Sequence, residues 1–459
     1  MKRLFLLISL ALLLVSALVF AACGQGAPAP APAPPATNGG GAGQAAPAPV
    51  DPGGAAAGDP IVIHYPTFQT GVNTAAAVVQ RLIDDFNEYF SGTFYINKEA
   101  VPGDQNYFEM MLVRLAANDL PPVVYGGGNN LLDLILAQDL AVDLTDAVHA
   151  DPEWLARFDE GAMAVNSRNG RIFASSNERS MIGYWYNREL FAEAGLSGPA
   201  TTWDEFFDQL VALNNAGITP MSLDTGDNAW VTMLWLGSMV GTHSADGLAF
   251  MNYVNPMSYN VPAMIHGISN MQYILQNHTT LDAIGGRYEH AANNFFASRT
   301  AMIANGPWMI GDFFDLTKTY EGFADKIGAA AFPGGFVYDS IIEGFIVTRQ
   351  NDPELEAAAI EMVRFFTSDR AQQIALEMQG MLPASPNVEI TESVKESFPH
   401  IADFLSQTMP APLRGTHFSA TMFPNVIDVL PQELPSLYYN QITPEEFATA
   451  LSEAAVLNR

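Results

Sequence analysis

The residues that could hold a ligand are aromatic rings and short polar groups that directly follow strand-like segments. Trp308 stands in "NGPWM", between the strand-like residues 300–303 and a helix-like run. Gly306 would let the backbone turn, and Pro307 suits the first position of a helix. An aromatic side chain at such a junction offers a flat apolar face to a ligand. The motif therefore predicts that Trp308 is a platform for a ligand, the alternative being a core tryptophan beneath the loop.

Weaker candidates follow other strand-like runs. Asp227, Asn228 and Trp230 stand in "GDNAW", after the strand-like "ITPMSL", and Asn129 stands in "GGGNN", after "PPVVY". Ligands of α/β sheets lie outside the carboxyl ends of strands, so these side chains are expected to face a ligand. Each could equally be a solvated loop residue or a core residue.

Alternating strand-like and helix-like segments must position these side chains. Residues 61–65, "IVIHY", read as a buried strand, and the next segment places Val78, Leu82, Phe86 and Phe90 at steps of four, on one face of a helix. About 400 residues follow residue 58, which suits two lobes. The alternation predicts an α/β fold with mainly parallel sheets and a ligand cleft between the lobes.

Capping motifs also indicate where two of these helices begin. Thr202 and Glu205 have capping-box spacing, and Gly217 marks the end of that helix. Thr443 and Glu446 repeat the pattern near the C-terminus.

Three longer segments carry a family resemblance. They are "GYWYNRELFAEAGLSGPATTWDEFFDQLVALNNAGITPMSL", "RTAMIANGPWMIGDF" and "EGFIVTRQNDPELEAAAIEMVRFFTSDRAQQ". These segments resemble the extracellular solute-binding proteins of carbohydrate ABC transporters, a family that includes maltose-binding protein. The resemblance implies a two-lobed periplasmic-binding-protein-like fold that closes on a carbohydrate and delivers it to the permease subunits of an ABC transporter. It also implies that the tryptophan of "NGPWM" stacks on sugar.

The resemblance implies lobe boundaries and further site residues. The expected lobes are 59–182 plus 329–367 and 183–328 plus 368–459, with crossings near residues 176–183, 329–335 and 367–370. Phe68 and Gln69 match the first cleft loop of the family, and Glu343 and Gly344 lie where its return strand enters the cleft. Glu178, Arg179 and Tyr184 fall near the first crossing, and residues 414–423 could supply another wall.

The N-terminus predicts export and anchoring. Lys2 and Arg3 precede an uncharged apolar run over residues 4–22, the layout of a signal peptide. Cys23 is the only cysteine, and "AAC" resembles the lipobox of bacterial lipoproteins, although Phe20 replaces the usual leucine. An uncleaved membrane anchor is the alternative. Residues 23–58 then form a lipidated start and a tether rich in Pro, Ala and Gly, which cannot bury enough apolar surface to fold.

The overall charge restricts the partners. With 20 basic against 49 acidic residues, the net charge of −29 argues against nucleic acid. No zinc, calcium or nucleophile motif is present, so no cofactor or metal is expected. The protein is also expected to be a monomer. Two other functions stay open. A secreted glycoside hydrolase could use Asp224, Asp227 or Glu343 as a carboxylate pair, and the same fold could bind a peptide, a polyamine or an organic anion.

Overall fold

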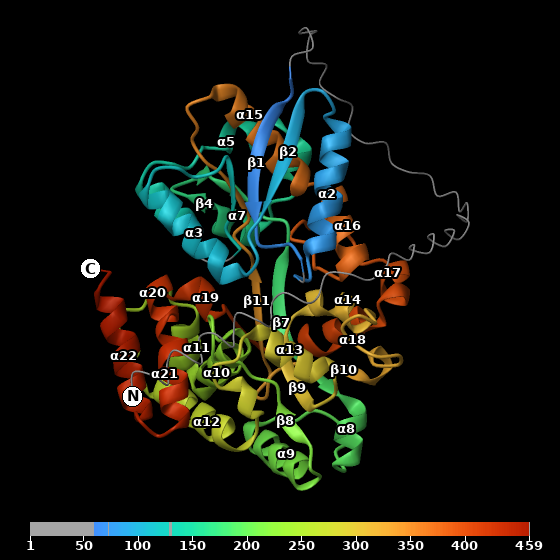
Figure 1. Ribbon diagram of the computed structural model, residues 1–459, viewed down its shortest axis with the longest axis vertical. Coiled ribbons are helices and arrows are strands. Elements are labelled where there is room, and N and C mark those ends of the chain that lie inside the picture. The colour runs from blue at the N-terminus through green and yellow to red at the C-terminus, as the bar shows by residue number, and fades with distance from the viewer. Residues whose placement is uncertain (1–58, 72, 128–130, 459) are drawn as a thin grey trace, which may run out of the picture. The chain divides into compact units, whose positions relative to one another are not determined.

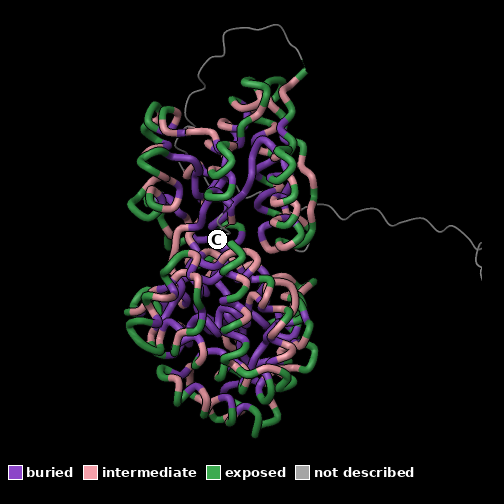
Figure 2. The backbone as a smooth tube through the Cα atoms, turned by 90° about the vertical axis from the view of Figure 1, so that its left-hand side faces the viewer, coloured by how far each residue is buried: buried purple, intermediate pink, exposed green. Residues whose placement is uncertain are grey.

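The computed structural model describes residues 59–71, 73–127 and 131–458, which belong to one compact unit, Ala57–Arg459 (Figure 1). Cys23, the tether and Asn129 lie outside the described residues. The lipid anchor, the tether and the ligand-facing position of Asn129 therefore stay predictions. Within the unit, the strands form two groups with separate hydrophobic cores. Figure 2 shows buried backbone running through the interior of each group.

The first lobe is built on short strands. Its strands are β1 (Ile61–Thr67), β2 (Phe94–Ala100), β3 (Val123–Tyr125), β4 (Ser167–Arg168), β5 (Arg171–Ile172), β6 (Ala174–Ser175) and β12 (Phe345–Val347). β1 and β2 are parallel, whereas β12 lies between β3 and β6 and is antiparallel to both.

Helices surround these strands. They are α2 (Ala76–Tyr89), α3 (Asp104–Ala116), α4 (Leu131–Ala137), α5 (Thr145–Ala150), α6 (Pro152–Leu155), α7 (Glu160–Asn166), α15 (Pro353–Phe366) and α16 (Asp369–Gln379). α2 buries Val78, Leu82 and Phe86, the face that the four-residue spacing predicted. The helix ends at Tyr89, and Phe90 is its C-cap residue.

The second lobe is built around β7 (Arg179–Asn187). Its other strands are β8 (Thr219–Met221), β9 (Thr300–Asn305), β10 (Ile327–Ala330), β11 (Phe336–Ile341) and β13 (Leu413–Gly415). They are ordered β13-β11-β7-β9-β8, and β10 pairs with the second half of β7. β8 and β9 are parallel, so both end at the same edge of the sheet.

The second lobe is rich in helices. They are α8 (Arg188–Glu193), α9 (Trp203–Asn215), α10 (Trp230–His243), α11 (Ala245–Met251), α12 (Pro262–Asn277), η1 (Leu281–Ala283), α13 (Tyr288–Phe296), η2 (Pro307–Met309), α14 (Ile310–Phe313), η3 (Ala324–Lys326), α17 (Glu392–Ser397), α18 (Pro399–Thr408), α19 (Phe418–Thr421), α20 (Pro424–Ile427), α21 (Val429–Tyr438) and α22 (Pro444–Val456). Both predicted capping boxes are present. Thr202 and Glu205 close the start of α9, and Thr443 and Glu446 close the start of α22.

The structure confirms the two-lobed α/β fold and corrects two details. The prediction of mainly parallel sheets was wrong: six of the nine strand pairings within the described residues are antiparallel, including β7 with β9, β10 and β11. The grouping of residues 329–367 with the first lobe was also wrong at its start. β10 and β11 pair with β7, so residues 331–335 connect two strands of the second lobe.

The chain passes between the two strand groups at three places, and only the first lies at a predicted crossing. Residues 176–178 join β6 to β7, within the first predicted crossing, and residues 342–344 join β11 to β12. A third passage follows α16, because α16 still packs against α2, whereas α17 packs against α18. The predicted start of the last second-lobe segment at residue 368 was therefore too early, since α16 belongs to the first lobe.

Candidate functional site

Two edges of the sheets, where parallel strands end, lie opposite each other. Residues 222–229 follow β8 and Gly306 follows β9 on one side, whereas residues 68–75 follow β1 and α3 follows β2 on the other. Gln105, in the first turn of α3, donates a hydrogen bond of 3.4 Å from Nε2 to Oδ1 of Asp428, which precedes α21. The charge of Asp104 on α3 also interacts with those of Asp227 and Glu289. Ligands of α/β proteins bind outside such strand ends, so this interlobe region is the candidate site.

Trp308 connects the two lobes. It lies in η2, directly after β9, at the strand–helix junction that the sequence predicted. Its half-buried ring packs against the hydrophobic cores of both lobes. The backbone carbonyl of Trp308 accepts a hydrogen bond of 3.2 Å from Nε2 of Gln379 on α16. A ring held at this place and partly exposed has the geometry of a platform, although it also contributes to packing.

Gly306 has a different role from the one expected. Its backbone is extended, with φ −100° and ψ −179°, so no left-handed turn requires a glycine. A Cβ at this position would lie 2.3 Å from Cζ3 of Trp308 and 2.4 Å from its Cη2. Gly306 therefore provides clearance for the indole ring, which lies over its Cα.

The loop after β8 brings three predicted residues together. Asp227, Asn228 and Trp230 are all half-buried, and Asp227 adopts a left-handed backbone with φ 49°. Oδ1 of Asp227 lies 3.3 Å from Nε of Arg287, yet burial keeps the pKa of Asp227 raised.

The ring of Trp230 packs against His417. The ring of His417 contacts it edge to face, with 5.5 Å between ring centroids. Nδ1 of His417 is 2.5 Å from Oγ of Ser419, and burial lowers the pKa of His417 to about 4, which leaves the imidazole neutral at pH 7. Part of the segment 414–423 thus packs against Trp230, and its role as a wall of the ligand site stays a prediction.

Phe68 and Gln69 separate at the end of β1. Phe68 is half-buried and belongs to an aromatic group with Tyr107, Phe108 and Tyr125, at centroid distances of 5.4, 5.7 and 6.1 Å. Gln69 is 5% exposed, and its Oε1 has no hydrogen-bond partner among the described residues.

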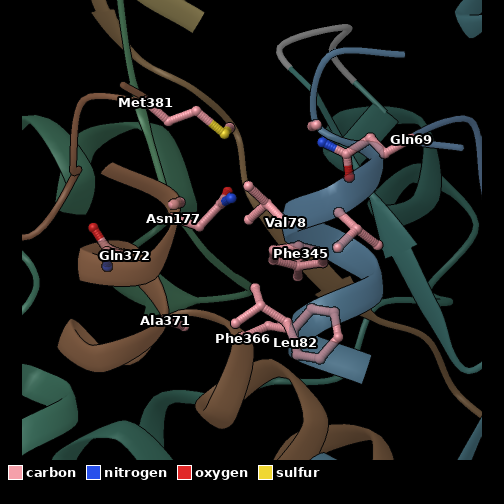
Figure 3. Close-up of a pocket in the computed structure, with 12 residues that line it drawn as sticks. Gln69, Val78, Leu82, Asn177, Phe345, Phe366, Ala371, Gln372 and Met381 are labelled. Atoms are coloured by element: carbon pink, nitrogen blue, oxygen red, sulfur yellow. The ribbon is translucent and has the colours of Figure 1, made fainter. Parts of the chain in front are cut away.

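Gln69 points into a small cavity instead of the interlobe region. The cavity lies between α2 and α16 and is also lined by Asn177, Phe345 and Met381 (Figure 3). Its volume of about 10 Å³ has room for roughly one water, so it cannot admit a sugar. The prediction that Gln69 faces the ligand was therefore wrong, because the side chain turns inward at the end of the strand.

Four further predictions, for Tyr184, Glu343, Gly344 and Arg179, were wrong because the side chains or the backbone serve the fold. Tyr184 is fully buried and its ring packs against Trp235 and Phe332. Glu343 is 4% exposed, and its Oε1 accepts a hydrogen bond of 3.1 Å from the backbone N–H of Leu132 in α4. Burial raises the pKa of Glu343 to about 7.

Gly344 approaches the neighbouring chain closely, since a Cβ there would lie 1.8 Å from the carbonyl oxygen of Ser175. The guanidinium of Arg179 is engaged by Asp339, at 2.6 and 2.8 Å, and this ion pair joins β7 to β11. Arg179 is thus neutralised within the sheet, contrary to its predicted role in ligand binding.

The sequence analysis named Asp227 but none of the other acidic side chains that lie with it in the interlobe region. The acidic set comprises Asp104, Glu109, Asp227, Glu289 and Asp428, which come from both lobes. Partial burial raises the pKa of Asp104, and the charges of Asp227 and Glu289 add to the effect. Burial followed by the charge of Glu109 likewise raises the pKa of Asp428. These residues are up to 324 positions apart, so no local motif could have linked them.

The acidic set limits the chemistry of the region. Arg287 pairs with Asp227, which leaves an excess of carboxylates that would repel an anionic solute. Among residues 59–71, 73–127 and 131–458, no group of three or more His, Cys, Asp and Glu side chains could hold a metal ion. Over the same ranges, no helix is long and apolar enough to span a membrane.

Comparison with known proteins agrees with this arrangement. The sequence matches the family described as bacterial extracellular solute-binding protein over residues 81–400. No match was found among curated proteins.

Solved structures share the fold. A chitin oligosaccharide binding protein has a TM-score of 0.75 and 20% identity, covering 87% of this chain and 99% of its own. A Streptococcus pneumoniae solute-binding protein in complex with the blood group A-trisaccharide has a TM-score of 0.72 and 18% identity, covering 85% and 98%. Maltose-bound MalE3 of T. maritima has a TM-score of 0.69 and 18% identity, covering 87% and 100%.

Since the family match spans more than half of the sequence, and the fold and interlobe region agree with it, this chain belongs to the bacterial extracellular solute-binding proteins.

Proposed function

We propose that the protein binds a sugar or oligosaccharide between its lobes, closes on it by hinge motion, and delivers it to an ABC importer. The observation that carries the proposal is the set of half-buried aromatic rings at strand ends of both lobes. Phe68 follows β1, Trp230 follows β8 and Trp308 follows β9. Rings of this kind supply flat apolar faces with little loss of side-chain freedom.

The polar groups of the region suit hydroxyls better than charged anions. Asn228 and Gln105 offer amides, Asp227 and Asp428 offer acceptors, and Arg287 offers donors. Solved structures that share the fold were obtained with maltose or a blood group trisaccharide, which supports a carbohydrate for this chain too.

The glycoside hydrolase alternative is less favoured. It needs two carboxylates facing one glycosidic bond. Asp224 is 1% exposed, and its Oδ1 accepts hydrogen bonds from the backbone N–H groups of Val231 and Thr232 in α10. Glu343 is likewise buried against Leu132. Two of the three candidate acids are thus held at helix starts, and binding without catalysis fits better.

A sugar panel tests the proposal. Melting temperature is measured with and without maltose, raffinose, chitin oligosaccharides and the blood group A-trisaccharide, and each mixture is then assayed for cleavage products. A bound ligand at a hundredfold excess over Kd stabilises the folded state by about 2.7 kcal/mol. A raised melting temperature with intact sugar is the expected result. Cleavage would favour the hydrolase, and stabilisation by a peptide or polyamine alone would overturn the choice of ligand.

We further propose that the mature protein is a lipoprotein, anchored through Cys23 at the extracellular face of the cell membrane and held away from it by residues 24–58. The support is the apolar run that ends in "AAC". Metabolic labelling with a fatty-acid analogue should mark the natural protein but not Cys23→Ser. Equal labelling of the two would contradict the anchor.

A further inference from the structure

Glu178 lies at the edge of the first lobe where ligands are expected. β3 and β6 are both antiparallel to β12, so they run in the same direction and end at the same edge. Tyr125 is the last residue of β3, and Glu178 follows the end of β6 by three positions, in the first passage between the lobes. The ring of Tyr125 is 6.1 Å from that of Phe68, one of the proposed sugar platforms.

Only one carboxylate oxygen of Glu178, Oε1, accepts a hydrogen bond from the described residues. The hydroxyl of Tyr125 donates to its Oε1 at 3.0 Å, and the backbone carbonyl of Glu178 accepts a hydrogen bond from the N–H of Ile342, at 3.3 Å. Tyr125 is 3% exposed, whereas Glu178 is half-buried. Within the described ranges, Oε2 has no hydrogen-bond partner and no basic side chain forms a salt bridge with Glu178.

The surroundings of Glu178 disfavour the charged form of its carboxyl group. Burial raises the pKa of Glu178 to about 7, although the hydrogen bond from Tyr125 opposes the shift. The other titratable groups here are Tyr65 and Tyr107, behind Tyr125, and the neighbouring Arg179, whose guanidinium is bound to Asp339. The pKa of Glu178 is thus raised by burial without a neighbouring counter-charge among the described residues. Carboxyl groups with strongly perturbed pKa values cluster at functional sites.

We propose that Glu178 binds the solute directly, with Oε2 accepting a hydrogen bond from a sugar hydroxyl, and that Tyr125 is the residue that positions it. This inference rests on the proposed function, because it assigns a contact within the same interlobe region. A half-buried acceptor beside an aromatic platform can recognise a hydroxyl at the edge of a ring that stacks on Phe68. Because the acceptor belongs to a passage between the lobes, the contact would also link the ligand to the hinge.

Titration calorimetry with maltose, raffinose and chitin oligosaccharides at pH 6 and pH 8 tests the assignment. For a sugar that the natural protein binds, Glu178→Gln should weaken affinity tenfold or more at pH 8, because an amide oxygen is a weaker acceptor than a carboxylate. The natural protein should bind more tightly at pH 8 than at pH 6, since the charged form is the acceptor, and this pH dependence should disappear in the variant. Glu453→Gln, an exposed position on α22, is the matched control and should match the natural protein.

Tyr125→Phe gives a second readout that does not depend on the Gln variant folding. Loss of the phenol hydroxyl removes the hydrogen bond that lowers the pKa of Glu178, so the rise in affinity should move to higher pH. Equal affinity of Glu178→Gln and the natural protein at pH 8 would overturn this inference and leave the proposed function standing. Failure of the natural protein to bind any sugar would overturn the proposed function and this inference with it.

Discussion

At the residue scale, the arrangement of Gly306 and Trp308 defines the candidate platform. The backbone of Gly306 is one that any residue could adopt, yet the indole of Trp308 occupies the space of its missing side chain. The glycine thus fixes where the ring can lie. A sequence motif shows that a glycine is present, but only the structure shows whether that glycine permits a turn or leaves room for a neighbouring ring.

Gly306→Ala tests whether the ring position matters for binding. The added methyl would meet the far edge of the indole at about 2.3 Å, so the ring must shift. We expect sugar affinity, measured by calorimetry, to fall at least tenfold, with a smaller effect on melting. Gly198→Ala is the control, because a Cβ there meets no atom within 4 Å. Unchanged affinity in Gly306→Ala would mean that the ring does not contact the ligand.

At the element scale, two buried carboxylates hold the starts of helices. Oδ1 of Asp224 accepts from the first turn of α10, and Oε1 of Glu343 accepts from Leu132 at the start of α4. Burial raises the pKa of each to about 7. Backbone N–H groups at a helix start favour the charged form, but here they do not offset the burial of the carboxylates.

These raised pKa values predict how stability depends on pH. The folded protein binds protons more strongly than the unfolded chain between the ordinary pKa of Glu343, 4.5, and its folded value of about 7. The free energy of unfolding should therefore fall as pH rises through this window, by on the order of 3 kcal/mol for Glu343 alone. Urea unfolding at pH 5 and pH 7.5 measures the fall, and Glu343→Gln should reduce it. A variant with the same pH dependence as the natural protein would refute this account of Glu343.

Elements proved more predictable than contacts between them. The spacing of Val78, Leu82 and Phe86 and the capping box of Thr202 and Glu205 are local patterns, and both appear in the structure as expected. Tyr184 could not be assigned correctly, because alternation along β7 does not distinguish a side chain that faces the core from one that faces the ligand. The interlobe contact of Gln105 with Asp428 depends on the packing of whole lobes, which no local pattern records.

At the scale of the whole molecule, function depends on two lobes that present strand ends to each other. The acidic set drawn from both lobes would oppose closure through like-charge repulsion, so a bound solute that bridges the lobes must outweigh this repulsion. Trp308 is the residue best placed for that task, since it already contacts the cores of both lobes. Removal of a buried aromatic contact typically costs about 2–4 kcal/mol of binding, or roughly thirtyfold to a thousandfold in affinity.

The most direct test is to compare Trp308→Ala with the natural protein in sugar affinity and in apo melting temperature. Trp203→Ala is the matched control, because Trp203 is also half-buried but lies on α9 and donates to Thr242, away from the interlobe region. We predict that Trp308→Ala loses at least thirtyfold in affinity for the best-bound sugar of the panel and keeps most of its apo stability, whereas Trp203→Ala keeps its affinity. Retained affinity in Trp308→Ala, together with a large drop in apo melting temperature, would show that the tryptophan only packs the lobes together and would contradict the sugar platform.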